Sequence, residues 1–412
     1  MVKQKKVLVL TADAGFGHRS AALAIKAAME VNYGGDCQVE IVNPLEDKRT
    51  PFFLRDSQTD YDKVVRNSPE LYRLGYDATD APIPTVIMES TLTILLFEVL
   101  RDLIFQVKPD VIVTTYPLYQ APLDSIFKVY RDVIPLFTVI TDLVDVHRIW
   151  FSNAVEGCMA PTVQVKDQAI ASGLPSEKVH ITGIPVHPNV IRDERPKEAI
   201  KAELGWRTDL PTILVVGSKR VDRIVETLEV LNHFGSPLQL AVTAGNDDML
   251  FEEFQRIEWH QPVHLYRFVE NMPVLMRASD AIVCKAGGLI VTESLACGLP
   301  MILIDIIPGQ EMGNAEYVVK GGAGDLARNQ IDTLFTLAHW LKNDGETLKE
   351  KSKAAILLGN PNSAYMVAEY LWQAAQRDSH NRKRRIIGRP LLIEFLAKNK
   401  IDLSDTIFSR KK

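Results

Sequence analysis

Two glycines and three polar side chains in one stretch of the chain have the types and spacing of a nucleotide-sugar site. Gly287 and Gly288 follow the apolar run 281–284 and precede a segment with helical spacing. Glycines at such a point let an anion approach the backbone N–H groups at the helix N-terminus. Glu293 lies early in that helix, where its carboxylate could accept both hydroxyls of a ribose.

The other two polar side chains follow the next apolar run. Gln310 and Glu311 come after residues 301–307, at the carboxyl end of an expected strand, where open α/β sheets bind ligands. An amide and a carboxylate side by side suit the hydroxyls of a sugar ring. The spacing alone also fits an ordinary βαβ unit in which the glycines only form a turn, so both interpretations stay open at this point.

A histidine near the start of the chain is the candidate for proton transfer. His18 lies in a glycine-containing loop, between the strand expected over residues 5–11 and the helix expected over residues 20–31. Its unperturbed pKa of about 6.5 suits a general base at neutral pH. The alternative is a residue that only hydrogen-bonds at the start of the helix. The loop lacks the G-x-G-x-x-G spacing and acidic residue of a dinucleotide site, which argues against NAD.

Short apolar runs alternate with helical segments along the chain, which predicts an α/β fold of Rossmann-like units. A length of 412 residues exceeds one typical hydrophobic core, so we expect two domains. Two prolines in residues 184–188 mark an extended linker between them. The expected division is an N-terminal acceptor and membrane domain, a C-terminal donor domain and a basic tail, over residues 1–185, 186–378 and 379–412.

Composition and charge restrict the class of protein. The hydrophobic content of 46% and charged content of 24% are typical of a soluble globular protein. The four cysteines lack disulfide or metal-ligand spacing, and we expect neither a signal peptide nor a transmembrane helix. From Arg382 to Lys412 the chain has ten Lys or Arg against three Asp or Glu. This basic tail on an acidic body predicts an anionic membrane surface as partner, and no nucleic-acid-binding fold is recognisable.

The central stretch also carries a family resemblance. The pattern GGL-x-x-x-E-[SA]-L-A-x-G-L-P followed by PGQE-x-x-NA, at residues 287–315, resembles the donor site of the GT-B glycosyltransferases that build membrane glycolipids. Monogalactosyldiacylglycerol synthases and bacterial diacylglycerol glucosyltransferases are similar here, and the lipid II-forming GlcNAc transferase more distantly. The resemblance runs from about residue 5 to residue 376. It implies a GT-B fold, with two Rossmann-like domains facing a central cleft and final helices that return to the first domain.

On the donor side, the resemblance implies that Glu293 holds the ribose of a UDP-sugar and that Gln310 and Glu311 hold its hexose. The diphosphate would meet Ser218 or Arg220, although many relatives have a longer glycine-rich turn there and a solvated basic turn is the alternative. No metal and no cofactor beyond the UDP-sugar are expected, since no D-x-D motif stands at a strand end. The other expected donor contacts are Gly17, Phe268, Val269, Gly287, Gly288, Leu289 and Asn314, with Phe268 and Val269 facing uracil.

On the acceptor side, the run GFGHRSAA at residues 15–22 resembles the family's first loop, which places the histidine beside the acceptor hydroxyl. His18 would then be the catalytic base, and Asp142 could orient a catalytic group. The run T-D-x4-H-x2-W, with His147 and Trp150, resembles the family's loop at the cleft, where His147 could touch donor phosphate. Structural roles are the alternative for Asp142, His147 and Trp150.

A second acceptor-side region is expected over residues 68–77, where Tyr72 and Tyr76 lie among aliphatic and basic residues. Plain packing and a membrane-facing surface are both open interpretations of this region. Phe52, Phe53 and the amphipathic helix expected over residues 94–107 could add to such a surface.

These features together predict an inverting glycosyltransferase. It would move a hexose from UDP-glucose or UDP-galactose to a membrane lipid, diacylglycerol first among the candidates. The expected location is cytoplasmic, peripheral on the inner face of the cell membrane. Two alternatives remain: a UDP-sugar 2-epimerase of the same architecture, and a non-catalytic, membrane-associated UDP-sugar sensor. The sequence does not distinguish glucose from galactose. The two sugars differ by one axial hydroxyl, and its recognition depends on the placement of side chains near Gln310 and Glu311.

Overall fold

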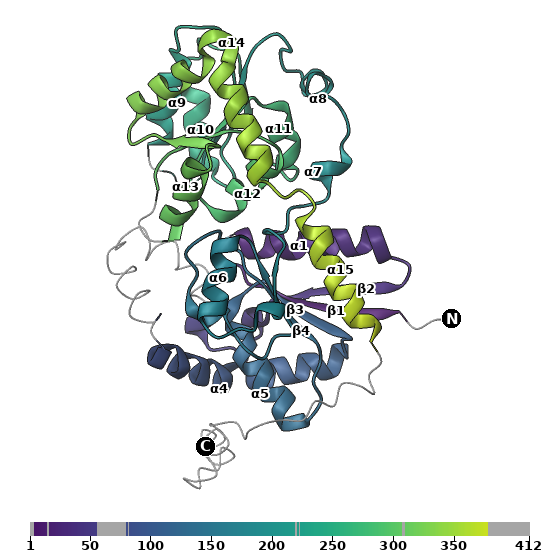
Figure 1. The fold of residues 1–412 in the computed structure, drawn as a ribbon. Helices are drawn as coiled ribbons and strands as arrows, with labels where there is room; N and C mark the ends of the chain where they lie inside the picture. Colours follow the sequence, from purple (N-terminus) through teal and green to yellow (C-terminus); the bar gives the residue numbers. More distant parts are fainter. Residues whose placement is uncertain are drawn as a thin grey trace.

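The structure is a computed structural model that describes residues 4–14, 16–55, 80, 82–218, 221, 223–306 and 310–377. These residues form two lobes, each built on a six-stranded sheet with helices on both faces (Figure 1). Every strand pairing in both sheets is parallel among the described residues. The predicted α/β, GT-B-type fold of two Rossmann-like domains is therefore confirmed.

The first sheet has the strand order β2-β1-β3-β4-β5-β6. Its strands are β1 (Lys5–Leu10), β2 (Cys37–Val42), β3 (Val111–Thr114), β4 (Leu136–Val139), β5 (Gly157–Ala160) and β6 (Val179–Ile181). Val7 of β1 is in register with Val39 of β2 on one side and Val111 of β3 on the other. The chain reverses its direction of travel across the sheet between β1 and β3, which creates a crevice at their carboxyl ends.

The second sheet has the order β12-β11-β10-β7-β8-β9, so its corresponding crevice lies between β7 and β10. Its strands are β7 (Thr212–Val216), β8 (Gln239–Thr243), β9 (Val263–Tyr266), β10 (Ala281–Cys284), β11 (Met301–Leu303) and β12 (Gly324–Leu326). The strand β12 was not predicted from the sequence. A three-residue strand is too short to show an alternating pattern, and its pairing with β11 is what defines it.

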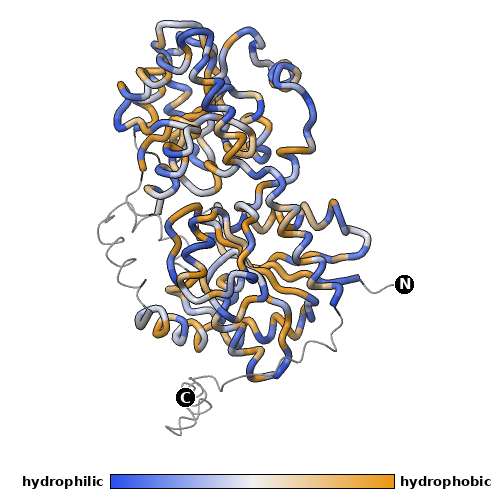
Figure 2. Tube along the Cα trace, in the orientation of Figure 1, coloured by the Kyte–Doolittle hydropathy of each residue, from blue (hydrophilic) through white to orange (hydrophobic). Residues whose placement is uncertain are grey.

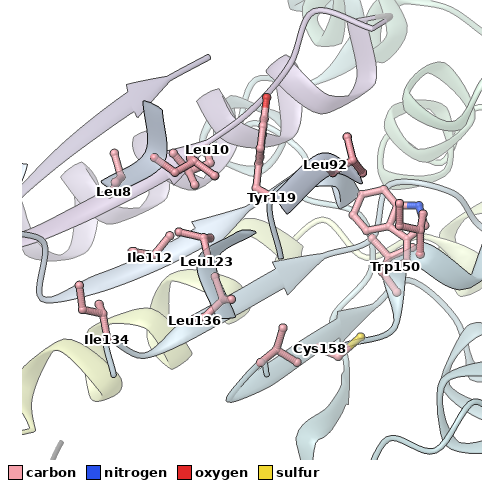
Figure 3. Packing of buried hydrophobic residues seen from close by; sticks show 14 of the residues in the cluster. Leu8, Leu10, Leu92, Ile112, Tyr119, Leu123, Ile134, Leu136, Trp150 and Cys158 are labelled. Carbon is pink, nitrogen blue, oxygen red and sulfur yellow. The ribbon is translucent and has the colours of Figure 1, made fainter. Parts of the chain in front are cut away.

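The helices around the first sheet cover its two faces with different strand residues. Val7 and Val9 face α1 (Phe16–Tyr33) and α15 (Ser363–Gln376), whereas Leu8 and Leu10 belong to the opposite core. Part of that opposite core is drawn in Figure 3. It is built with α4 (Pro82–Val107), α5 (Gln120–Tyr130) and α6 (Val163–Ala171). Burial on both faces explains the continuous apolar runs of these strands.

Helices of the second lobe likewise pack on both faces of its sheet. They are α8 (Lys197–Glu203), α9 (Ile224–Asn232), α10 (Asp248–Arg256), α11 (Met272–Ala278), α12 (Gly288–Ala296), α13 (Gln310–Lys320) and α14 (Gln330–Leu358), which is interrupted by non-helical backbone at residues 342–345. Short connecting helices are η1 (Pro44–Glu46), η2 (Pro117–Tyr119), η3 (Arg148–Trp150), η4 (Ser176–Lys178) and α7 (Asn189–Arg192). After α14 the chain crosses back, and α15 lies beside α1 on the first lobe (Figure 1).

Two helices of the first lobe begin earlier than the sequence predicted. α4 starts at Pro82 rather than near Ile94, because proline is tolerated in a first helical turn. α1 starts at Phe16, so His18 lies in its first turn and not in a preceding loop. The early start of α1 fixes the backbone of His18 within regular structure.

Apolar residues are concentrated on the strands at the centre of each lobe (Figure 2). Within the described ranges, no helix combines the length and apolarity needed to cross a bilayer. Several large apolar side chains on α4 are nevertheless exposed to solvent, namely Val86, Ile87, Ile94 and Phe105.

Candidate active site

The carboxyl ends of the two sheets meet through the segment that follows β4. A Cβ atom added to Gly288, at the start of α12, would lie 2.8 Å from the carbonyl oxygen of Thr141. Beside this contact, the Asn314 side chain accepts a hydrogen bond from the Leu143 N–H at 3.2 Å. The same amide donates to the Ala286 carbonyl at 3.0 Å. The start of α12 is therefore held directly against the end of β4.

His18 is oriented by two threonines at strand ends of the first sheet. Its Nδ1 lies 2.8 Å from the Thr115 carbonyl oxygen and 2.9 Å from Oγ1 of Thr141. Because a carbonyl oxygen can only accept, these contacts assign the proton to Nδ1 and leave Nε2 with its lone pair. This tautomer is the one that a general base needs, with Nε2 as the atom that accepts a proton.

Aromatic rings enclose His18. The ring of Tyr116 meets the imidazole edge-on at 4.9 Å between centroids, and the Trp150 ring lies at 6.1 Å. Burial lowers the pKa of His18 to about 4, although the hydrogen bond to Thr115 acts in the opposite direction. His18 is therefore neutral at physiological pH, in the form that can accept a proton.

The orienting hydrogen bonds of His18 come from residues that the sequence did not single out. Thr115 and Thr141 each follow an apolar strand, which is where polar residues of an α/β site collect. Asp142, which was predicted to orient a catalytic group, is the half-buried neighbour of Thr141. Among the described residues, the side-chain partners of His18 do not include Asp142. Its catalytic role stays a prediction.

His147 and Trp150 make structural contacts at η3. Nδ1 of His147 accepts the Ile149 N–H at 3.1 Å, which caps η3, and lies 3.7 Å from the Asp80 carboxylate. Burial lowers the pKa of His147. Trp150 is buried, and its carbonyl accepts a hydrogen bond from Gln120. Contacts of either with an acceptor or a phosphate stay predictions, and the predicted residues Tyr72 and Tyr76 lie outside the described residues.

The donor side is organised by the first turn of α12. Gly287 is the residue that caps this helix, and Gly288 and Leu289 begin it. The first N–H groups of a helix have no partner within the helix, and the helix dipole adds partial positive charge there. This end of α12 can therefore receive a diphosphate in the crevice between β7 and β10.

Glu293 is the carboxylate closest in sequence to that helix end. It is half-buried and accepts no hydrogen bond from a described residue. Burial raises the pKa of Glu293 to about 7. A desolvated carboxyl group without protein donors gains when ligand hydroxyls donate to it, which supports the predicted contact with a ribose.

The remaining predicted donor residues lie at carboxyl ends of strands or at helix starts. Ser218 follows β7, and Phe268 and Val269 follow β9, with Phe268 54% exposed and Val269 packed against the core. Gly17 lies in the first turn of α1, and nothing is within 4 Å of a Cβ placed there. Gln310 begins α13 with Glu311 after it, whereas Arg220 lies outside the described residues.

Comparisons with known proteins agree with this arrangement. A family model described as Monogalactosyldiacylglycerol (MGDG) synthase matches residues 18–186, and Glycosyltransferase family 28 C-terminal domain matches residues 212–367. A probable monogalactosyldiacylglycerol synthase, chloroplastic, from Glycine max is 33% identical over 92% of this chain and 73% of that protein. The chain belongs to the monogalactosyldiacylglycerol synthase family. Monogalactosyldiacylglycerol synthase 3, chloroplastic, from Arabidopsis thaliana is 32% identical over 90% of this chain and 82% of its own length.

Solved structures show the same architecture. Acinetobacter baumannii MurG has a TM-score of 0.57 at 15% identity, covering 90% of this chain and 99% of its own. UDP-GlcNAc 2-epimerase from Neisseria meningitidis, bound to UDP-GlcNAc, has a TM-score of 0.57 at 15% identity, covering 89% and 100%. At such identities the likeness concerns the fold alone. Family membership, and not the fold, identifies this chain as a glycosyltransferase and confirms the resemblance stated from its motifs.

One expectation from the sequence is overturned by these relatives. The monogalactosyldiacylglycerol synthases from Glycine max, Arabidopsis thaliana and Spinacia oleracea are described as chloroplastic. The expected cytoplasmic location on the inner face of a cell membrane is therefore wrong. It rested on the scattered cysteines and the short apolar run near the N-terminus, which do not specify a compartment.

The contact between Gly288 and Thr141 gives a first testable prediction. Gly288→Ala should lower kcat/KM by about 10–100-fold, because the added methyl group must push the start of α12 away from the residue that holds His18. Gly287→Ala is the matched control: its methyl group would only reach Ile290 at 3.8 Å, so we expect a much smaller loss. Equal losses in the two variants, measured as initial rates, would contradict this account of the contact.

Proposed function

We propose that this glycosyltransferase moves a hexose from UDP-glucose or UDP-galactose to the free hydroxyl of diacylglycerol, with inversion at the anomeric carbon. Family membership supports the diacylglycerol acceptor, and the names of the relatives favour galactose. The observation that carries the proposal is the placement of His18. Its free Nε2 lies at the end of the first sheet, and Thr141 links it to the anion-binding end of α12.

In the proposed reaction, Nε2 of His18 takes the proton of the acceptor hydroxyl while the hydroxyl oxygen attacks the anomeric carbon. The bond from that carbon to the β-phosphate oxygen breaks on the opposite face, and UDP leaves with the electron pair. The N–H groups at the start of α12 meet the negative charge that develops on the diphosphate. Glu293 holds the ribose, and Gln310 and Glu311 hold the hexose. The proposal uses no metal and no cofactor besides the donor.

Two other activities fit parts of this arrangement. A UDP-sugar 2-epimerase has the same fold, but it has no need of an acceptor hydroxyl or a lipid-facing surface. A UDP-sugar sensor on a membrane would need no oriented base, whereas His18 is held as one tautomer by two hydrogen bonds. Both alternatives therefore leave the geometry of His18 unexplained.

A single assay tests the proposal against both alternatives. Radiolabelled UDP-glucose and UDP-galactose are incubated with diacylglycerol, a ceramide-like lipid and a polyprenyl acceptor, and the lipid products are separated. We expect labelled glycolipid with diacylglycerol, and at least about 100-fold less of it with His18→Asn. A changed sugar still attached to UDP would indicate an epimerase, and binding without any product would indicate a sensor; either result would overturn the proposal.

We also propose that the protein binds anionic bilayers peripherally, through two surfaces. The first lobe presents Phe52, Phe53 and the exposed apolar residues of α4. The tail has a local net charge of +7, and each Lys or Arg near an anionic leaflet is worth about 1 kcal/mol. The tail lies outside the described residues, so its part in this proposal rests on sequence alone.

Truncation after Asp378 separates the two surfaces in a vesicle sedimentation assay. Full-length protein should bind vesicles containing anionic lipid strongly at low salt and weakly at high salt. The truncated protein should bind less and respond less to salt, because screening acts on the charges that it has lost. Phe52→Ser combined with Phe53→Ser should reduce the binding that remains. Equal sedimentation of full-length and truncated protein at low salt would remove the tail from the proposal.

A further inference from the structure

A lysine next to the anion-binding turn is buried without the hydrogen bonds that an ammonium group needs. Lys285 is the residue between β10 and Ala286, and it is only 9% exposed. Its Nζ is buried and makes no hydrogen bond of good geometry to a described residue. It does lie 3.0 Å from Oε1 of Glu311, so the two form an ion pair whose direction is poor for a hydrogen bond.

Burial of such a lysine lowers the free energy of unfolding. An ammonium group has three N–H donors, and removal from water is repaid only when a counter-charge and further hydrogen bonds satisfy it. A methionine of similar volume would fill the same space without that cost. The stability of the fold therefore does not explain the presence of a lysine at this position.

Lys285 and Glu311 lie where the donor is proposed to bind. β10 borders the crevice between β7 and β10, and it pairs with β11 through Cys284 and Leu303. Lys285 follows β10, and Glu311 lies in the first turn of α13, which follows β11. The ion pair thus connects the turn that precedes α12 with the start of α13. These are the two segments proposed to hold the diphosphate and the hexose.

We propose that Lys285 is a positioning residue that fixes the Glu311 carboxylate to accept hydroxyls of the donor hexose. The inference rests on the proposed function, in which Glu311 contacts that hexose. An ammonium ion at 3.0 Å holds one oxygen of the Glu311 carboxylate in place and leaves the other oxygen to accept from a ligand. A purely structural pair would instead only tie the end of β10 to α13.

Lys285→Met is the variant that separates these roles, because it removes the charge and keeps most of the volume. We expect kcat/KM for the UDP-hexose to fall about 30–100-fold. The Kd for UDP, which has no hexose, should change by less than about 3-fold. Lys285→Arg, which restores a cation, should recover activity to within about 10-fold of the wild type.

A double-mutant cycle with Glu311→Gln tests the coupling itself. If Lys285 acts through Glu311, the double variant should be no worse than Glu311→Gln alone, within about 3-fold in kcat/KM. Losses that multiply independently would overturn the inference. So would a loss of UDP affinity as large as the loss of UDP-hexose turnover, because Lys285 would then contact the diphosphate directly.

Lys351→Met provides the matched control. Lys351 is another largely buried lysine of the second lobe, and it pairs with Asp325 at 2.9 Å, near β12. This variant should lower the thermal unfolding midpoint and leave kcat/KM unchanged. The same pattern in Lys285→Met would show a structural role and overturn the inference. Failure of the wild type to bind any UDP-hexose would instead overturn the proposed function, so the two failures are distinguishable.

Discussion

Replacement of His18 by alanine is expected to lower turnover by about 10²–10⁴-fold while the affinity for UDP stays nearly unchanged. The imidazole is held through Nδ1 by Thr115 and Thr141, and Nε2 is the only ring atom left to accept a proton. Alanine removes that acceptor without touching the start of α12. Initial rates at saturating donor, together with calorimetry of UDP binding, measure the two quantities separately.

His18→Asn is the sharper version of the experiment. The asparagine amide can donate to the Thr115 carbonyl as Nδ1 does, but it offers no basic nitrogen in place of Nε2. It should therefore be nearly as inactive as His18→Ala. A variant that keeps more than about a tenth of wild-type turnover would mean that another group takes the proton, since general bases typically contribute at least 10²-fold. Asp142 would be the next candidate.

The acid limb of the pH profile should also carry the signature of His18. Its pKa is lowered to about 4, and protonation would inactivate the base. In kcat/KM for the lipid acceptor, measured at saturating donor, activity should therefore persist below pH 6 and fall only as the pH approaches about 4. A limb near the ordinary histidine value of about 6.5 would contradict the burial of His18 in the working enzyme.

Glu293→Ala is expected to weaken UDP binding by about 1.5–3 kcal/mol, the value of a lost charge-assisted hydrogen-bonded pair. The carboxyl group of Glu293 is half-buried and receives no hydrogen bond from a described residue, so bound ribose hydroxyls would be its main donors. Glu253→Gln, on the exposed side of α10, is a control that should leave UDP affinity unchanged. Calorimetry that finds the same Kd for Glu293→Ala and wild type would remove Glu293 from the site.

Glu293 should also make the affinity for the donor depend on pH. Burial raises the pKa of Glu293 to about 7, and the proposed ribose contact needs its ionised form. Affinity for a UDP-hexose should therefore be highest above pH 7 and fall as the pH drops below it, by no more in total than the loss expected for Glu293→Ala. Glu293→Gln should bind more weakly and lose this dependence. A pH dependence that persists unchanged in Glu293→Gln would assign it to another group.

Much of this fold could be predicted from sequence because its strands are buried on both faces. Runs such as residues 7–10 and 213–216 are continuously apolar, and each is followed by glycine or by helical spacing. The short strand β12 could not be predicted, since its three residues are defined by pairing with β11. The start of α4 was also missed, because the apolar residues of this helix surround it and show little amphipathic spacing.

The candidate site could be predicted only in part, because the sequence shows residue types but not the partners of each residue. Gly287, Gly288 and Glu293 could be found, since their spacing follows from one strand–turn–helix unit. Thr115 and Thr141 could not, because their contact with His18 joins three separate strand ends. Lys285 was likewise overlooked, since its pairing with Glu311 depends on where the first turn of α13 lies relative to the end of β10.

The stereochemistry of the product is the most direct test of the proposed mechanism. The enzyme is given UDP-α-galactose or UDP-α-glucose with diacylglycerol, and the anomeric configuration of the purified glycolipid is read from its proton NMR spectrum. Direct attack by a hydroxyl that His18 has deprotonated predicts a β-linked hexosyl diacylglycerol. An α-linked product would require a different mechanism, and the absence of any glycolipid would contradict the proposed reaction altogether.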